Sequence, residues 1–250
     1  MAFHLMAYYG SVPTGSVYSK VPALQSVWET IQNSNLVVSA VNNIIGAYAY
    51  GPNMVRAQLQ SPSLQSPGYP DLQPVAASAP VAGGTPAWHS YLSNPLALKT
   101  NEQLSAYSIN GGASAENELI ALLLADKPPA PKTGRIITLR LTGATTLTAG
   151  AWTEVPLTFV DNLPVGSYSV VGARFQSAGA LLGRVGYPGF GYRPGTVAVQ
   201  SSAEPDVPGA RMGGWGEWFT FNSTVQITAE FLSASADTAE TVFLDLIGPQ

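Results

Sequence analysis

The chain contains no cysteine and little charge, with 11 Lys and Arg against 15 Asp and Glu among its 250 residues. Without cysteine, disulfides, thiolate metal ligands and thiol nucleophiles are all excluded. The net charge of −4 and the absence of any run of basic residues remove the electrostatic attraction on which tight binding to phosphate backbones depends. We therefore expect a fold held together by packing, with no specific nucleic-acid site.

Long hydrophobic runs are also missing. The longest dense run, residues 119–125, is far shorter than the roughly 20 residues of a membrane-spanning helix. Residues 1–10 are apolar but lack a basic start, so they do not resemble a secretion signal. We expect a chain that is soluble or assembled with other chains, not embedded in a membrane.

Clusters of catalytic or metal-binding residues are absent from the sequence as well. The two histidines, His4 and His89, belong to different regions, and the acidic residues are scattered. No phosphate loop ending in Gly-Lys-Ser/Thr and no Gly-x-Ser-x-Gly motif occurs. The sequence therefore predicts no enzyme, no cofactor and no metal site. Two less favoured alternatives are a glycosidase acid pair formed by folding and calcium bound by loop acids at Asp71, Glu204 and Asp206.

The residues that are abundant favour short strands. Hydrophobic residues make up 46% of the chain, while 25 glycines and 20 prolines supply many turns. This mixture predicts an all-β protein.

Segments of the first half recur in the second half in the same order. Each short match alone carries little weight in a chain rich in Ala, Val and Leu, but the shared order of all six indicates a duplicated module. The matched pairs are Trp28–Ile31 with Trp152–Val155, Val37–Ala40 with Val170–Ala173, Ile44–Gly46 with Leu181–Gly183, Trp88–Tyr91 with Trp215–Trp218, Gln103–Ala106 with Gln226–Ala229, and Ala115–Leu123 with Ala239–Ile247.

The repeat distinguishes between helix and strand for two segments whose local sequence pattern resembles a helix. Ser114 and the glutamates after it resemble a helix start, but the counterpart segment, residues 238–247, alternates and contains strand-favouring residues. We therefore predict a strand over Asn117–Ala125, with a helix as the alternative. Pro22–Gln32 is likewise predicted to be a strand, because its partner contains Pro156, which would cost about 3 kcal/mol inside a helix.

The second module contains about eight candidate strands, the number that a jelly roll needs. They are Ile136–Leu141, Thr153–Val160, Ser167–Arg174, Leu181–Tyr187, Thr196–Gln200, Glu217–Phe221, Thr224–Leu232 and Thr241–Ile247. Together with the repeat, this count predicts two tandem jelly rolls, each an eight-strand antiparallel sandwich, in one double jelly roll.

Three prolines between Lys127 and Lys132 mark the clearest linker in the chain. We accordingly predict a first jelly roll over residues 21–127, a Pro-rich linker over 128–132 and a second jelly roll over 133–250. Residues 1–20 have only one possible counterpart, Arg135–Thr148, so we treat them as an N-terminal arm or an extra strand.

Aromatic residues gather around the Gly/Pro-rich loops of the second module. Packing within the loops and core is the simplest interpretation; a subunit interface is favoured over a sugar platform, because interfaces are enriched in these residue types. The residues are Tyr187, Phe190, Tyr192, Trp215, Trp218 and Phe219.

With its duplicated modules, short N-terminal segment, low charge and lack of a catalytic cluster, the chain resembles the double jelly-roll major capsid proteins of small tailless icosahedral bacteriophages. The resemblance implies a virion shell subunit that is assembled in the host cytoplasm and forms homotrimeric, pseudo-hexagonal capsomers with other capsid proteins as partners. It also implies that residues 1–20 tie neighbours together or face an internal membrane or the genome. The expected subunit contacts are Phe3, Tyr8, Tyr9, Tyr187, Phe190 and Tyr192. The alternative function is a two-domain carbohydrate-binding or adhesin protein of the same fold.

Overall fold

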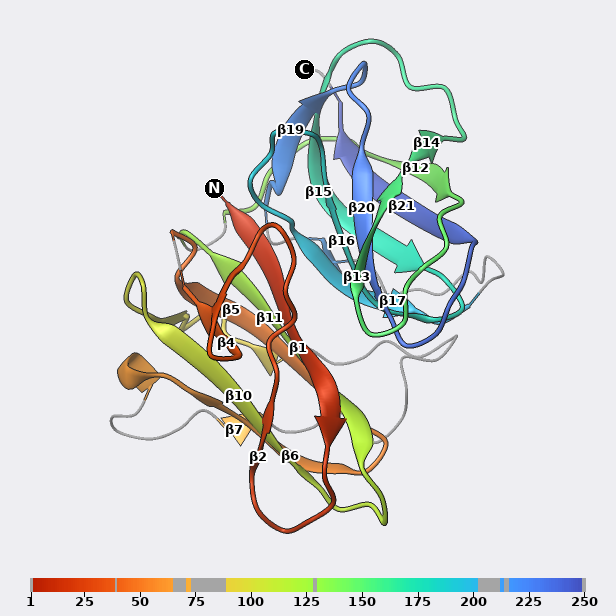
Figure 1. Cartoon of the computed structure of the whole chain (residues 1–250). Coiled ribbons are helices and arrows are strands. Elements are labelled where there is room, and N and C mark those ends of the chain that lie inside the picture. Colours follow the sequence, from red (N-terminus) through yellow and green to blue (C-terminus); the bar gives the residue numbers. More distant parts are fainter. Residues whose placement is uncertain are drawn as a thin grey trace. The chain divides into compact units, whose positions relative to one another are not determined.

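The computed structural model describes residues 2–38, 40–64, 71–72, 89–127, 130–201, 212–213 and 216–248. These residues form β-strands and one short 3-10 turn, η1 (Pro62–Leu64), and none of their helices is long and apolar enough to cross a membrane. The chain divides into two compact units at residues 128 and 129, with residues 1–3 grouped with the later unit. The prediction of an all-β protein is confirmed (Figure 1).

The first unit is a sandwich of two sheets. One sheet has the order β1-β11-β5-β8 with β9 also paired to β5, and the other has the order β3-β4-β10-β6-β7 with β2 also paired to β10. The strands are β1 (Phe3–Val12), β2 (Ser19–Val21), β3 (Thr30–Gln32), β4 (Asn35–Val37), β5 (Asn43–Tyr50), β6 (Met54–Gln60), β7 (Asp71–Leu72), β8 (His89–Ser90), β9 (Leu96–Ala97), β10 (Gln103–Asn110) and β11 (Glu116–Ala125).

The second unit has the same two layers. One contains β12-β21-β15 with β18 and β19 paired to β15, and the other contains β13-β20-β16-β17; a short parallel pairing of β17 with β15 links them. The strands are β12 (Ile136–Gly143), β13 (Trp152–Pro156), β14 (Thr158–Phe159), β15 (Ser167–Gln176), β16 (Ala180–Gly186), β17 (Gly195–Val199), β18 (Met212–Gly213), β19 (Phe219–Asn222), β20 (Thr228–Ser233) and β21 (Glu240–Ile247).

Both units arrange their strands in the same order. Strands β1, β4, β5 and β6 of the first unit correspond to β12, β13, β15 and β16 of the second, and we count them as positions one to four. In each unit, the last strand (β11 or β21) lies between position one (β1 or β12) and position three (β5 or β15). In each, the next-to-last strand (β10 or β20) lies between the second position (β4 or β13) and the fourth (β6 or β16). This is the strand order of a jelly roll, so the predicted double jelly roll is confirmed by the pairing itself.

The strand order corrects two of the six repeat matches. Val37–Ala40 begins at the end of β4, whereas Val170–Ala173 lies in β15, and Ile44–Gly46 lies in β5, whereas Leu181–Gly183 lies in β16. Both matches are wrong by one strand position. The equivalent strands β5 and β15 start at residues 43 and 167, an offset of 124, which equals the offset between the starts of β11 and β21 at residues 116 and 240. Trp88 and Trp215 lie outside the described residues.

The structure also decides the predictions for the first unit. Asn117–Ala125 is strand, as predicted, and the helix alternative is excluded. Phe3–Val12 is a strand paired within a sheet, so of the two alternatives for residues 1–20 the extra strand holds and a free arm does not. Only the last three residues of Pro22–Gln32 form a strand, because a turn at Val27–Trp28, in which the Ser26 hydroxyl accepts the Trp28 N–H at 3.1 Å, interrupts the segment.

Most strands of the second unit start and end within a few residues of their predicted limits. The predicted strand Thr153–Val160 splits at Leu157, which is 3% exposed and whose N–H turns to the carbonyl oxygen of Ile227 at 3.1 Å. The predicted strand Thr224–Leu232 starts later, because Asn222 Oδ1 accepts the N–H and hydroxyl of Thr224 and makes a turn there.

The burial of each strand follows its place in the sandwich. Strands β5, β11, β15 and β16 are buried along nearly their whole length, and most of their buried residues are apolar, although Glu118, Arg174 and Arg184 are buried among them. In contrast, β10 alternates between half-buried and buried residues. One face of β10 therefore packs in the core through Leu104 and Ala106, while the other carries Gln103, Ser105 and Tyr107 towards the surface.

We predict that Gly195→Ala lowers the stability of the second unit. A Cβ at this position would lie 2.2 Å from the backbone oxygen of Gly183, and backbone atoms cannot move aside as a side chain can. Overpacking of this kind costs about 1–3 kcal/mol, so thermal unfolding should shift down by several degrees. Gly191→Ala is the matched control, because nothing lies within 4 Å of its Cβ. Equal unfolding temperatures for the two variants would contradict the close packing of β16 on β17.

Candidate interaction surface

The second unit carries a compact aromatic loop between β16 and β17. Its residues 187–192, here called the aromatic loop, stack the rings of Tyr187 and Phe190 with centroids 5.2 Å apart and planes 17° from parallel. The ring of Tyr192 meets Phe190 edge-on at 6.0 Å. The three rings are half-buried, and the residues between them, Pro188, Gly189 and Gly191, are exposed. The loop thus exposes aromatic ring surface together with backbone and proline surface, to which a partner could bind.

A tight turn shapes this loop. The N–H of Phe190 donates to the carbonyl oxygen of Tyr187 at 3.0 Å, and Gly189 has a φ of +85°, which L side chains rarely adopt. The ring of Pro188 fixes the φ of that residue, which precedes Gly189, near the value that such a turn requires. The sequence Pro-Gly therefore brings the two stacked rings to the same side of the loop.

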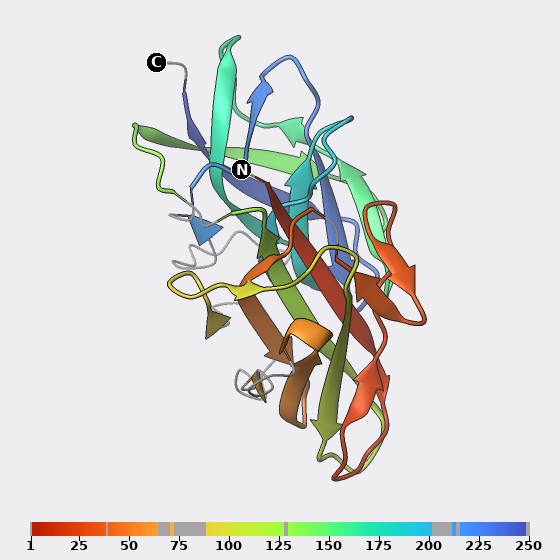
Figure 2. The same ribbon diagram turned by 90° about the vertical axis from the view of Figure 1, so that its left-hand side faces the viewer.

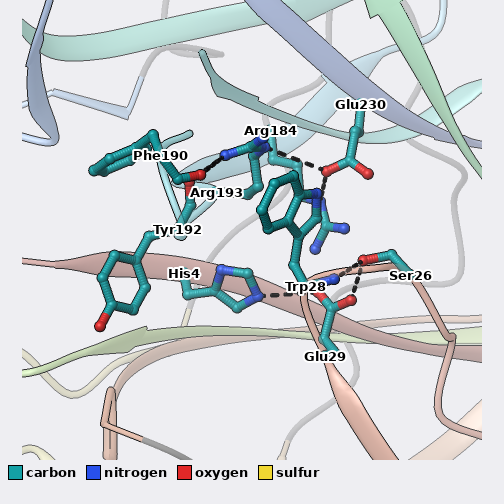
Figure 3. Close-up of polar contacts among 9 residues, drawn as sticks. All are labelled: His4, Ser26, Trp28, Glu29, Arg184, Phe190, Tyr192, Arg193 and Glu230. Carbon is teal, nitrogen blue, oxygen red and sulfur yellow. Dashed lines mark hydrogen bonds and ion pairs between the residues drawn. The ribbon is translucent and has the colours of Figure 1, made fainter. Parts of the chain in front are cut away.

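Arg193 stabilises the backbone of the aromatic loop through hydrogen bonds from its buried side chain. Its side chain is buried, and its Nη1 donates to the carbonyl oxygens of Phe190 and of Tyr192, the latter at 3.0 Å (Figure 3). A Cβ on Gly186 would lie 2.5 Å from the same Nη1, so this glycine makes room for the guanidinium. The loop backbone is consequently fixed at its last residues, as well as at its turn.

The buried carboxylate of Glu230 lies close to the guanidinium groups of Arg193 and Arg184 and offsets their positive charge. Glu230 Oε2 lies 3.7 Å from Nε of Arg193 and accepts a hydrogen bond from Nε of Arg184 at 2.8 Å. Arg184, which has no exposed surface, also stacks on the ring of Trp152 at 4.0 Å. Removing the carboxylate would leave two buried cations without this partner, which is strongly destabilising in a protein interior. The aromatic loop is therefore built on the core of its own unit.

Further aromatic rings join the loop to the core. Phe219 lies 5.1 Å from Phe190 and 5.6 Å from Tyr187, and it contacts Phe221 at 6.3 Å. Phe219 is 5% exposed and Trp218 is 1% exposed, so for these two aromatics the interpretation as core packing holds. Trp215 lies outside the described residues.

The predicted contact residues near the N-terminus lie inside the protein. Phe3 and Tyr8 have no exposed surface and Tyr9 is 9% exposed. The hydroxyl of Tyr8 donates to the carbonyl oxygen of Leu104, and burial raises the pKa of Tyr8 well above its usual value. These positions argue against a role as surface contacts, because side chains without exposed area cannot touch a neighbour.

The sequence did not predict a buried contact between a histidine and a glutamate in the first unit. His4 Nε2 lies 3.0 Å from Oε1 of Glu29, whose other oxygen accepts the Ser26 hydroxyl (Figure 3). His4 is 2% exposed, and His89 is a half-buried residue of the short strand β8. Among the described residues, no three His, Asp or Glu side chains gather as metal ligands would. Glu204 and Asp206 lie outside that part of the chain.

Two buried glutamates of the first unit have opposite titration behaviour. Burial raises the pKa of Glu118, Ser108 opposes the rise and the Glu116 carboxylate adds to it. Burial also acts to raise the pKa of Glu102, but hydrogen bonds from Ser61, Ser63 and the Lys99 N–H outweigh it and lower that pKa to about 2. The Glu116 carboxylate accepts hydrogen bonds from the backbone N–H and the side-chain amide of Asn53.

Two solved structures are similar to this chain over nearly its whole length. The major capsid protein P2 of bacteriophage PM2 is 10% identical, with 99% of this chain and 98% of that chain covered and a TM-score of 0.24. The STIV MCP is 8% identical, with 100% of this chain and 98% of that chain covered and a TM-score of 0.27. No protein-family model and no curated protein matches the sequence. The jelly-roll assignment rests on the strand order of the two units.

We predict that Glu118→Gln stabilises the protein increasingly as the pH rises. A carboxyl whose pKa is raised by folding stabilises the folded state below its unfolded pKa, and this contribution is lost as the pH rises through the folded pKa. The difference in unfolding free energy between variant and parent should therefore be small at pH 4 and favour the variant at pH 7, as measured by denaturant titration.

Glu102→Gln is the matched control with the opposite sign. Its lowered pKa contributes stability above the unfolded value, and that contribution is lost as the pH falls towards 2. This substitution should cost about 2 kcal/mol at pH 7, because the carboxylate accepts several hydrogen bonds, and less at pH 3. Parallel pH profiles for the two variants would refute the assignment.

Proposed function

We propose that this chain is a structural subunit of a virus capsid that assembles into trimeric, pseudo-hexagonal capsomers. The observation that carries the proposal is the presence of two jelly rolls with one shared strand order in a single chain. Two similar modules combined with a threefold axis present six similar edges to their neighbours, which suits a closed lattice. The protein acts in the virion, after assembly in the host cytoplasm, and carries out no catalysis.

The aromatic loop supplies the contact that we propose between subunits. Tyr187, Phe190 and Tyr192 combine apolar area with two hydroxyl groups, the composition that is enriched at protein interfaces. The turn at Gly189 and the hydrogen bonds from Arg193 fix the loop before any partner arrives, so little conformational entropy remains to be lost on binding. These features support homotrimers and contacts with other capsid proteins.

The contact with an internal membrane or the genome that was predicted for residues 1–20 does not form part of this proposal. Strand β1 takes up Phe3–Val12 and pairs with β11, and most of its side chains are buried. The buried side chains of β1 are therefore not available to a neighbour, whereas residues 13–17, which follow it, are exposed.

We expect the purified full chain to form particles of three times the 26.1 kDa chain mass, or larger shells. Size-exclusion chromatography with light scattering measures the mass, and electron microscopy of the chain expressed together with other virion proteins shows any shell. Phe190→Ser should weaken trimer association at least tenfold, since a central aromatic contact contributes about 2 kcal/mol or more. A monomer at every concentration would refute the proposal.

Val165→Ser is the matched control for this experiment. Val165 is 81% exposed in the same unit but lies outside the aromatic loop, so its replacement removes apolar surface without touching the proposed contact. Its association should equal that of the parent chain. A monomer that gives strong, specific signals on a glycan array would instead favour the alternative function, a carbohydrate-binding or adhesin protein.

A further inference from the structure

The first unit contains a polar cavity at one end of its second sheet. Its volume of 420 Å³ lies within the usual range of small-ligand sites. Strand β10 forms its floor, and Figure 1 and Figure 2 show the orange turn η1 beside the start of this strand. The lining residues are Asn35, Gln60, Ser61, Pro62, Asn101, Glu102, Gln103 and Ser105.

Strand register brings the side chains of the floor together. Ser105 of β10 is paired directly with Gln60 of β6, and Gln103 lies two residues away on the same half-exposed face. On the other side of β10, strand β4 begins at Asn35. Three strands thus present hydroxyl and amide groups side by side.

Hydrogen bonds between these side chains fix their positions. Asn35 Nδ2 donates to Oε1 of Gln103 at 2.8 Å, and Ser105 Oγ donates to Oδ1 of Asn35 at 2.9 Å. Gln103 Nε2 in turn donates to Oε1 of Gln32 at 2.9 Å. Each amide keeps further hydrogen-bonding capacity, because one NH₂ group has two donors and one carbonyl oxygen has two lone pairs. The floor is therefore a pre-arranged array of neutral donors and acceptors.

Glu102 shapes the wall of the cavity and does not act as a free charge. One carboxylate oxygen accepts the Ser61 hydroxyl and the Ser63 N–H, and the other accepts the Ser63 hydroxyl and the Lys99 N–H. These four bonds occupy the lone pairs of the carboxylate. A cation would have to break them, and none of the described residues that line the cavity is a Lys or Arg that would attract an anion.

Two lining groups remain open to a ligand. The side-chain amide of Asn101 and Oε1 of Gln60 make no hydrogen bond within the part of the chain that the structure describes. Asn101 is exposed and holds a φ of 65°, which sets its side chain at the rim of the cavity. Pro62 is the one apolar residue among the lining residues described. Neutral hydroxyl groups match this set better than charged or apolar ligands do.

We propose that this cavity binds a neutral saccharide, whose hydroxyl groups pair with the side chains of Asn35, Gln60 and Asn101. The proposal is independent of capsid assembly, because all the groups that it uses belong to one jelly roll. In a shell subunit, such a site serves attachment to a glycan.

Saturation-transfer NMR on the full chain tests the proposal with glucose, galactose, mannose and N-acetylglucosamine as probes. At least one should bind with a Kd on the order of 1 mM, as expected for a small site with few apolar contacts. Asn101→Gly should weaken that binding about tenfold, and Asn35→Ala should weaken it further. The first variant keeps the fold, because glycine readily adopts the positive φ of this position.

Gln226→Ala is the matched control, since Gln226 is an exposed glutamine of the other unit. Its binding should be unchanged, and unfolding temperatures establish that all variants fold. The proposal is overturned by the absence of transfer to all four sugars, by equal binding in the Asn35 and Asn101 variants, or by binding of inorganic phosphate or sialic acid alone. Light scattering on the same samples reports assembly separately, so a failure of one proposal leaves the other measurable.

Discussion

Each jelly roll depends on the pairing of its last strand. Strand β11 lies between β1 and β5, and β21 lies between β12 and β15, so both edges of each last strand are hydrogen-bonded to segments made much earlier. Neither main sheet is complete until the whole module has been synthesised. The apolar character of β1 follows from the same constraint, because a strand paired to β11 and buried on most of its length must be apolar.

This constraint also explains how the chain uses its few charges. Among the residues that the structure describes, nine acidic and basic side chains are buried, and several have defined partners: Glu230 pairs with Arg184, and Glu102 accepts four hydrogen bonds. Where a buried carboxyl has no cationic partner among the described residues, as at Glu118, burial raises its pKa and favours the neutral form. The surface is left comparatively neutral, so copies of the chain meet with little repulsion and association should depend weakly on salt.

The sequence predicted the fold well where strand chemistry and repeat order agreed. The matches at Gln103 and Ala115 identified β10 and β11 correctly, but the Val- and Ala-rich matches failed because every central strand of a sandwich has that composition. An arm or an extra strand was predicted for residues 1–20 because the repeat offered them only one possible counterpart, residues 135–148. The candidate sites were less predictable: Glu230 follows Arg184 by 46 residues, and no local pattern links them.

The two candidate surfaces occupy the same topological position in the two modules. The polar cavity forms where β6 ends at Gln60, and the aromatic loop starts where the equivalent strand β16 ends at Gly186. One fold position therefore carries amides and hydroxyls in one module and stacked rings over a buried arginine in the other. Strand pairing fixes the backbone at this position in both modules, but it uses backbone groups only, so the side chains presented there are free to differ. A threefold assembly of the chain would carry three copies of each surface, two chemically distinct kinds of site on one repeated fold position.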